Sequence, residues 1–382
     1  MVIKQRLSHV AKLTCALAIS ISPSVLSADT FVQTNLVSSV PGLANTTDPN
    51  LIDPWGVSFA GGSPFWVSNQ GSGTTTLYDG AGNLKEVAPN TPAVTVPGGT
   101  GAAAGPTGQV FNSTTSFSVN GAASHFIFAN LNGTISAWTG GASAVQVAAV
   151  SGATFTGLAL AGSGGSNYLY AADSTANTGK IDVFNSAFHP VALAGNFTDP
   201  NAIAGYVPFN IQVIGSNLYV TYALLNPYGS SQPGGYIDIF TTGGQFVSRF
   251  ASGGALNAPW GLALAPSTFG EFAGDLLVGN NGDGFINAFN ATTGAWVGIL
   301  DGTNDQPLDF QDLWALDFRT AGTNVDTNAL YFAEGINMNA QGQDTGGIFG
   351  ELTVATPEPS SFVPIALGVL GLALLARRPK AV

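Results

Sequence analysis

Short apolar stretches alternate with polar, turn-forming residues along most of this chain. Residues 258–300 show the pattern best, and it predicts four strands, at Trp260–Leu264, Leu276–Gly279, Phe285–Phe289 and Ala295–Leu300. Gly, Asn, Asp and Pro lie between them, where tight turns require a positive or preset φ. Because a single four-stranded sheet leaves both of its faces uncovered, this unit cannot fold alone and predicts further copies.

The same unit recurs six times at a regular interval. Its first strand is found at Trp55, Thr107, Thr156, Phe209, Trp260 and Trp314, and successive positions differ by 52, 49, 53, 51 and 54 residues. In each copy a second strand and then a Gly-led third strand follow in the same order. A period near 50 residues with four strands in each unit is typical of a β-propeller. We therefore expect an all-β, six-bladed propeller over residues 29–354.

The last unit lacks a fourth strand. Its first three strands are expected at residues 313–318, 329–334 and 347–354, and the chain then reaches Pro357. We expect Phe31–Val37 to supply the missing outer strand and close the ring, since closure covers an edge that would otherwise invite aggregation. Two connections stand out as long loops, Ala223–Gly235 and Gly335–Gly347. They predict a binding groove over blade five, although insertions that are merely tolerated remain an alternative.

Charge and cysteine content restrict the possible partners. Only 8% of the residues are charged, and residues 29–356 hold 4 Lys or Arg against 21 Asp or Glu, a net charge of −17. Such a surface cannot neutralise phosphates, which excludes nucleic acid as an expected partner and disfavours direct binding to anionic lipid. The single cysteine, Cys15, precedes this body, so no disulfide or thiol nucleophile is expected in it.

Residues 1–28 form a predicted signal peptide. Lys4, Arg6 and Lys12 precede the apolar run Leu13–Ile21, and small residues follow up to Ala28. This order of basic, apolar and small residues is typical of a cleaved secretory leader. The body is therefore expected to be exported.

Residues 355–382 form a second targeting signal. Pro357-Glu358-Pro359 precedes the apolar run Phe362–Ala376, and Arg377 and Arg378 follow it. The run is marginal in length for a transmembrane helix, and the cations fix its end on the cytoplasmic side. The segment resembles the sorting signal of PEP-CTERM proteins. The resemblance implies processing by an exosortase in a Gram-negative bacterium that makes exopolysaccharide, with transient residence in the inner membrane before release to the cell surface or matrix. A plain membrane anchor is the alternative.

The repeats themselves resemble NHL-type six-bladed propellers. The shared pattern is P-x-G-apolar-x-apolar, then a strand ending in Asn or Asp, then G-x-I-x-x-F, and it covers most of residues 50–354. The basic residues common in NHL repeats are nearly absent here. With its tail, the chain resembles an uncharacterised family of PEP-CTERM propeller proteins, a resemblance that implies no particular reaction.

Polar residues at the strand ends suggest a metal site. Asp53 and Asp312 precede first strands, and Asp173 and Glu334 end second strands, so all four should share one rim. Carboxylate and amide oxygens are the ligands of calcium. Lactonase-type six-bladed propellers hold calcium with such a set, and the possible analogue here is Asp53, Asn210, Asn280 and Glu334. The alternative is that these residues only cap turns.

Aromatic residues suggest a second site. Trp55, Phe209, Trp260 and Trp314 occupy the same first-strand position in blades one, four, five and six. This arc could stack on sugar rings, or its members could pack between blades. The two body histidines, His125 and His189, lie in different blades, and no nucleophile motif accompanies them, so neither a zinc site nor a catalytic triad is expected.

Two functional hypotheses follow. The first is a non-catalytic surface or matrix protein linked to exopolysaccharide, with no catalytic residues. The second is a calcium-dependent, lactonase-like or other hydrolase of the six-bladed propeller type. Bound metal together with activity that depends on Glu334 would favour the second hypothesis, and retention on polysaccharide that depends on Trp260 would favour the first.

Overall fold

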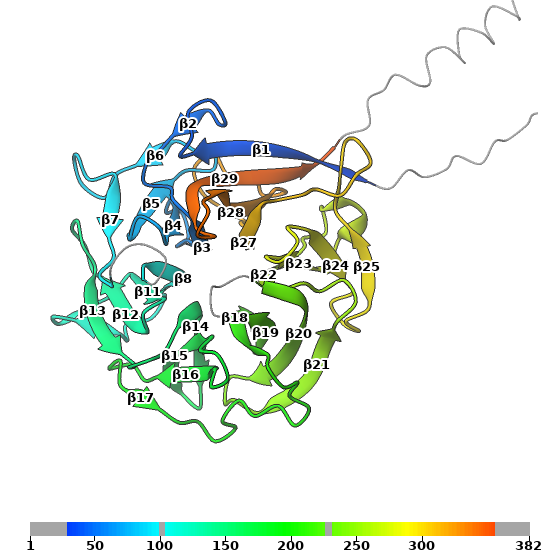
Figure 1. Ribbon diagram of the computed structural model, residues 1–382. Helices are drawn as coiled ribbons and strands as arrows, with labels where there is room; N and C mark the ends of the chain where they lie inside the picture. The colour runs from blue at the N-terminus through cyan, green and yellow to red at the C-terminus, as the bar shows by residue number, and fades with distance from the viewer. Residues whose placement is uncertain (1–28, 99–103, 226–230, 356–382) are drawn as a thin grey trace, which may run out of the picture.

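The computed structural model describes residues 29–98, 104–225 and 231–355. Within these ranges, six sheets of four main strands stand around a central axis (Figure 1). The predicted all-β, six-bladed propeller is confirmed. The predicted signal peptide and the Pro-Glu-Pro sorting segment lie outside the described residues, and both stay predictions.

Each blade runs outward from the axis in chain order. The innermost strands are β3 (Pro54–Ser58), β8 (Pro106–Phe111), β14 (Phe155–Ser163), β18 (Val207–Ile214), β22 (Pro259–Leu264) and β27 (Asp312–Phe318). The second strands are β4 (Phe65–Asn69), β11 (Phe126–Asn130), β15 (Ser166–Asp173), β19 (Asn217–Leu225), β23 (Leu276–Asn280) and β28 (Leu330–Met338). In blade five these bounds differ from the expected ones by a single residue at one end.

The outer half of each blade is more variable. The third strands are β5 (Thr74–Tyr78), β12 (Thr134–Trp138), β16 (Lys180–Phe184), β20 (Ser231–Thr241), β24 (Ile286–Phe289) and β29 (Asp344–Val354). The outer strands of blades one to five are β6 (Leu84–Lys85), β13 (Val145–Ala149), β17 (Pro190–Val191), β21 (Phe246–Ser252) and β25 (Trp296–Ile299). Strand β7 (Ala93–Thr95) also pairs with β5, and β9 (Ser118–Val119) with β10 (Ala122–Ala123) forms a small separate hairpin.

Strand β1 (Thr30–Ser38) closes the ring, as predicted. It pairs antiparallel with β29, from Phe31 opposite Val354 to Ser38 opposite Ile348. Its two ends also pair with β26 (Asp301–Gly302) and β2 (Thr46–Thr47). In Figure 1 the first and last strands of the propeller accordingly lie side by side in one blade.

The start of β1 also contacts blade five. The Asp29 backbone N–H donates to Glu271 Oε1 at 2.9 Å, and the Glu271 N–H donates to Asp29 Oδ2 at 2.7 Å. Glu271 belongs to the 3₁₀ turn η1 (Gly270–Phe272), between β22 and β23. The N-terminal strand therefore joins blade six to its neighbour as well as completing it.

The core consists of apolar layers between neighbouring blades. All residues of β4 and β11 are buried, because each sheet has another sheet on both faces. This explains why the inner strands read as near-continuous apolar or small residues and alternate less than a half-exposed strand would. The layer between blades five and six contains Phe31, Phe269, Phe272, Leu316 and Phe332.

The glycine that recurs before third strands has a steric cause. Gly73, Gly133 and Gly284 have φ of +67°, +74° and +72°, in the left-handed region that favours glycine. At Gly284 a Cβ would lie 1.8 Å from the Phe310 carbonyl oxygen of the next blade. The sequence landmark therefore marks a tight turn pressed against a neighbouring blade.

Parts of the two predicted long loops are instead paired strands, which corrects that expectation. Strands β28 and β29 continue past the blade, with Ile336 opposite Gly346 and Met338 opposite Asp344. In blade four, β19 and β20 likewise continue to Leu225 and Ser231. Cross-strand hydrogen bonding extends the regular structure into residues whose Gly, Gln and Asn content had favoured a loop.

Candidate metal centre

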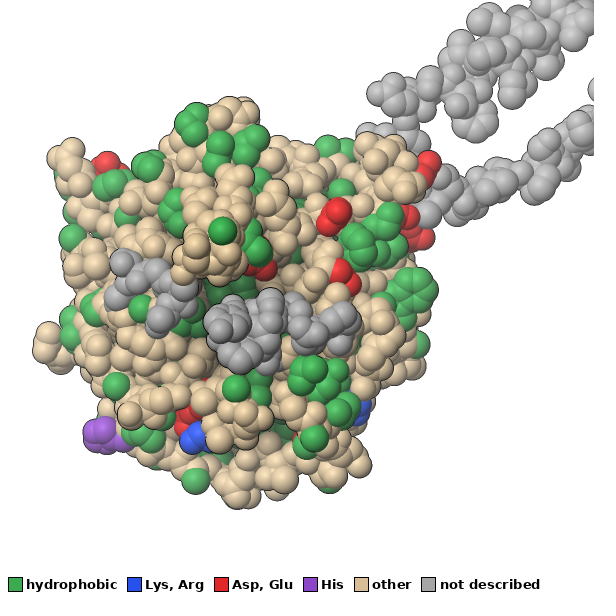
Figure 2. All heavy atoms as spheres, viewed as in Figure 1, with side chains coloured by type: hydrophobic (Ala, Val, Ile, Leu, Met, Phe, Trp, Pro, Cys, Tyr) green, Lys and Arg blue, Asp and Glu red, His purple; other side chains and the backbone are tan. Residues whose placement is uncertain are grey.

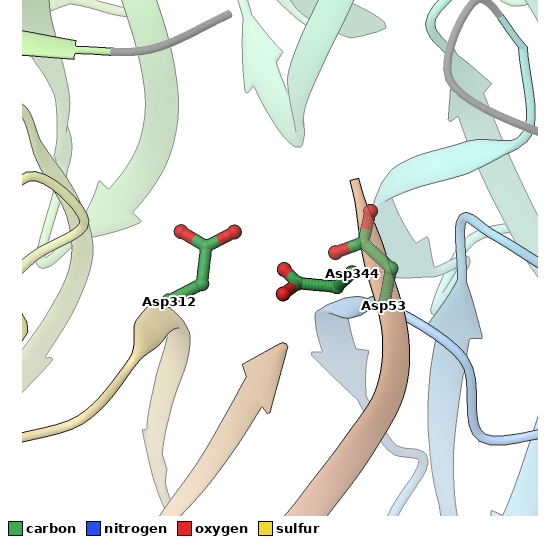
Figure 3. Close-up of side chains that lie close together, drawn as sticks. All are labelled: Asp53, Asp312 and Asp344. Atoms are coloured by element: carbon green, nitrogen blue, oxygen red, sulfur yellow. The ribbon is translucent and has the colours of Figure 1, made fainter. Parts of the chain in front are cut away.

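Three aspartates from the two blades that close the ring meet at the channel rim. Asp53 directly precedes β3 in blade one, and Asp312 and Asp344 begin β27 and β29 in blade six. One carboxylate oxygen from each lies within 4.8 Å of the other two. Figure 3 shows the three carboxyl groups converging, with that of Asp344 between the other two. We refer to these three residues as the carboxylate cluster.

Backbone and indole groups fix Asp53. Its φ of +48° is uncommon for a residue with a side chain and is tolerated best by Asn and Asp. The Asp53 N–H donates to the Gly346 carbonyl at 3.1 Å, and its own carbonyl accepts from Gln70 at 2.9 Å. The Trp55 indole N–H donates to Asp53 Oδ1 at 2.8 Å. The conformation directs the carboxyl group across the boundary between the first and last blades.

The other two carboxyl groups depend on neighbouring small or amide side chains. Asn281 of blade five donates its amide N–H to Asp312 Oδ1. Asp344 has room because residue 335 is glycine, since a Cβ there would lie 2.1 Å from Asp344 Oδ2. Asp344 is 8% exposed, and its buried Oδ1 accepts no hydrogen bond from the described residues. An acceptor buried without a donor is costly unless a cation or a proton compensates it.

The electrostatics of the carboxylate cluster favour a bound positive charge. Burial, followed by the charge of Asp344, raises the pKa of Asp53 to about 8. Burial also raises the pKa of Asp312 well above its usual value and raises that of Asp344. No ion pair among the described residues includes any of the three. On the face in Figure 2, acidic side chains lie beside the central hollow and Lys or Arg side chains are few.

The donor set fits calcium. All three ligating groups are carboxylates, which are hard oxygen donors, and each can bind through one or two oxygens. With a cation present, all three can ionise together. Without one, their mutual repulsion in a buried site keeps at least one of them protonated near neutral pH.

The predicted set of Asp53, Asn210, Asn280 and Glu334 is only partly assembled around this point. Glu334 is buried beside the cluster, where it accepts from the Gln311 N–H at 2.7 Å, and burial raises its pKa to about 7. Asn210 instead donates to the Trp260 carbonyl at 2.8 Å, and Asn280 donates to the Ala255 carbonyl at 2.8 Å. A role for these two amides in binding metal stays a prediction.

Sequence reasoning placed Asp312 on the rim but left Asp344 out altogether. Asp344 lay within a stretch read as a loop, so its position at the start of a strand carried no signal. One sequence feature could have indicated Asp344: it is an acidic residue followed closely by Gly346 and Gly347, near the start of a third strand. This position corresponds to the rim on which Asp53 and Asp312 lie.

The predicted aromatic arc forms a plug in the channel. Trp55 and Trp314 stack with ring centroids 3.4 Å apart, and Trp260 meets Trp314 edge-on at 5.8 Å. Phe209 lies 5.8 Å from Trp314, and all four side chains are at most 7% exposed. The Trp260 indole N–H crosses to the Thr156 carbonyl of blade three at 3.0 Å. The small Thr side chains of blades two and three thus leave space for the large rings opposite.

This plug favours packing over ligand stacking as the role of the four aromatics. Trp55 and Trp314 already stack face to face, and Trp260 and Phe209 meet Trp314 edge-on, so a sugar ring would have to displace these rings. The ligand-stacking prediction stays untested. Beyond the plug, the inner strands of all six blades line a channel cavity of about 280 Å³, to which Gln109, Asn210 and Asp317 contribute polar groups.

Comparison with known proteins gives the fold and the family. The chain is 12% identical to a glucose dehydrogenase, with a TM-score of 0.53 over 85% of this chain and all of that one. It is 12% identical to the GH93 α-L-arabinofuranosidase of Fusarium graminearum, with a TM-score of 0.51 over 85% of this chain and 98% of that one. At such identities the likeness shows the propeller fold alone. No helix in the described residues is long and apolar enough to span a membrane.

No protein-family profile matches the chain. Two proteins of Acanthamoeba polyphaga mimivirus do match it along most of their length. Uncharacterized protein R648 is 34% identical over 334 residues, covering 80% of this chain and 77% of R648. Uncharacterized protein L690 is 30% identical over 333 residues, covering 83% of this chain and 84% of L690. This chain therefore belongs to the same family as the uncharacterised mimivirus proteins R648 and L690.

Proposed function

We propose that the propeller is an exported, non-catalytic binding protein of the cell surface or matrix, which holds a calcium ion at the carboxylate cluster and engages exopolysaccharide. The observation that supports a bound cation is the convergence of Asp53, Asp312 and Asp344, whose oxygens lie within 4.8 Å of one another and which form no ion pair among the described residues. The buried, donor-free Oδ1 of Asp344 supports it independently of the cluster's charge.

The position of the cluster indicates what the cation does. Asp53 precedes the first strand of blade one, whereas Asp312 and Asp344 belong to the last blade. A calcium ion bound by all three would therefore join the two blades that meet at ring closure. The chain has no cysteine in residues 29–356, so a metal is the available cross-link at this boundary.

Export rests on the two targeting signals in the sequence. The predicted leader, residues 1–28, and the Pro357-Glu358-Pro359 segment with Arg377 and Arg378 support sorting by an exosortase and contact with the membrane only before processing. Replacing the three motif residues by alanine should leave the chain uncut in the membrane fraction of a Gram-negative host that has an exosortase. Release of the variant at the wild-type rate would contradict the sorting proposal.

Calcium titration of the purified propeller tests the metal site. Isothermal titration calorimetry should show one calcium per chain, and Asp344→Asn or Asp312→Asn should weaken binding at least tenfold, since each removes one of three charged ligands. Asp305→Asn is the matched control, because Asp305 is an exposed acidic residue elsewhere. Equal binding by Asp305→Asn and Asp344→Asn would overturn the site.

One observation favours the enzymatic alternative. Burial holds the pKa of Glu334 at about 7, the range suited to a general acid or base, beside the carboxylate cluster. A calcium-dependent hydrolase, lactonase-like or otherwise, would use such a group. Turnover of lactones or esters that requires calcium and is lost in Glu334→Ala, with the fold unchanged, would favour this function over the binding role.

A further inference from the structure

A second site lies between blades four and five, away from the carboxylate cluster. The cavity has a volume of about 530 Å³. Gly234 of the blade-four hairpin forms one side, and blade five and the segment leading into it form the rest, through Gly254, Leu256, Asn257, Asp283, Phe285, Asn287 and Ile299. Of the two stretches expected to wall a groove over blade five, Ala223–Gly235 borders this cavity through Gly234, whereas no residue of 335–347 is among those that line it.

One polar group of this groove is a hydrogen-bond acceptor without a donor among the described residues. The Asn257 Oδ1 is buried and accepts no hydrogen bond from the described residues. Asp283 adds a carboxylate, and none of the described residues that line the cavity is a Lys or Arg. A ligand that supplies hydroxyl donors would satisfy the Asn257 oxygen, whereas an anionic ligand would meet only negative charge.

An exposed tryptophan adjoins the groove. Trp296 on β25 is 54% exposed, which is uncommon for so large an apolar side chain. Its indole N–H donates to Asn287 Oδ1 at 3.0 Å, and Asn287, which lines the groove, donates in turn to the Ala255 carbonyl at 3.2 Å. The orientation of the ring is therefore held through its polar edge, while about half of the side chain stays exposed.

We propose that Trp296 and the groove of Asn257, Asp283 and Phe285 form a binding site for a neutral saccharide chain. The faces of Trp296 offer an apolar platform for the C–H face of a pyranose, at little entropic cost because the ring is already held. The groove accepts hydrogen bonds from the hydroxyl groups of an adjoining sugar. This site rests on the proposed exopolysaccharide-binding function and gives it a location and a ligand class, which the buried plug of Trp55, Trp260 and Trp314 does not.

Affinity electrophoresis through native gels tests this site. The gels contain hydroxyethylcellulose, galactomannan or dextran as neutral probes, and alginate as the anionic probe, all with calcium present. The propeller should be retarded by at least one neutral glycan. Trp296→Ala and Asn257→Ala should each weaken that retardation, Trp296→Ala by about tenfold in apparent dissociation constant.

Val297→Ala is the matched control. Val297 is 46% exposed and adjoins Trp296 on the same strand, where successive side chains point to opposite faces, so its loss should leave retardation unchanged. Retardation of wild type and of Trp296→Ala to the same extent would overturn this site and leave the proposed function standing. Retardation by alginate alone would overturn the neutral ligand class. No retardation by any of the four polymers would overturn both the site and polysaccharide binding.

Discussion

Replacement of Phe31 by alanine should destabilise the whole propeller, although this residue lies almost at the start of the described chain. Phe31 is 1% exposed, and its ring stacks on Phe269 and Phe272 with centroids 5.0 and 6.0 Å away. It opens the β1–β29 pairing, opposite Val354. A single side chain thus joins the strand that closes blade six to the apolar layer shared with blade five.

The magnitude follows from that burial. Phe→Ala changes in a closed core cost about 3–5 kcal/mol, because transfer free energy is lost and a cavity remains. Loss of two ring contacts places Phe31→Ala in the upper part of this range, at about 4 kcal/mol. For a domain of this size the melting temperature should fall by roughly 6 °C.

Urea unfolding followed by tryptophan fluorescence measures the change, since the chain has six tryptophans, most of them buried. Val32→Ala is the control on the same strand, because Val32 is 41% exposed, and it should change the free energy of unfolding by no more than about 0.5 kcal/mol. If Phe31→Ala costs less than about 1 kcal/mol, β1 does not close the ring cooperatively and the reasoning fails. Removal of residues 29–40 should then also be harmless, whereas we expect it to leave the body insoluble or strongly destabilised.

Three further predictions concern charged and tightly packed groups. In the absence of calcium, stability should fall as pH rises from about 4 to 8. Burial raises the folded-state pKa of Glu334 from 4.5 to about 7 and that of Asp53 from 3.8 to about 8, so in this range the folded state holds protons that the unfolded state has released. The pKa shift of Glu334 alone corresponds to a loss of roughly 3 kcal/mol in the free energy of unfolding over this range. Melting temperatures measured with EDTA should fall with rising pH, and excess calcium should flatten this dependence. Melting temperatures that rise with pH would refute the raised pKa values. Gly335→Ala should weaken calcium binding at least tenfold in calorimetry, because the added Cβ would displace the Asp344 carboxylate. Gly162→Ala is the control and should bind calcium normally, because its Cβ would meet no atom closer than 3.6 Å. Arg319→Met should lower the free energy of unfolding in urea by about 3 kcal/mol. The buried guanidinium donates to the Ala60 and Ser63 carbonyls of blade one and lies 4.6 Å from the centroids of two Phe rings. A stability equal to that of wild type would show that these contacts are dispensable.

The repeat pattern was enough to predict the architecture. Local turn chemistry recurs in three of the six copies, at Gly73, Gly133 and Gly284, and a sheet that buries both faces can only be satisfied by neighbouring copies. The count of strands in the last copy also predicted the closing strand at Phe31–Val37, because an unpaired edge is unfavourable in any ring. These features depend on contacts between residues close in sequence, or on a period that the sequence displays directly.

The candidate site was predictable only in part. Asp53 and Asp312 were placed on one rim by their positions before first strands, whereas Asp344 was missed because it reaches the cluster through a hairpin that reads as a loop. The four first-strand aromatics likewise share a position in the repeat, yet their mutual stacking depends on small residues in the opposite blades. Trp296, just beyond a predicted turn, carried no signal, because its exposure depends on its place on the outermost strand of blade five.

The sequence by itself determined the number of blades, their strand order and the way the ring closes, because each is repeated or forced by an unpaired strand. Only the tertiary structure decided which side chains meet across the axis and across the boundary of blades one and six. Those contacts depend on the tilt of each blade and on the space that its neighbours leave. The sequence pattern of a single repeat indicates neither quantity.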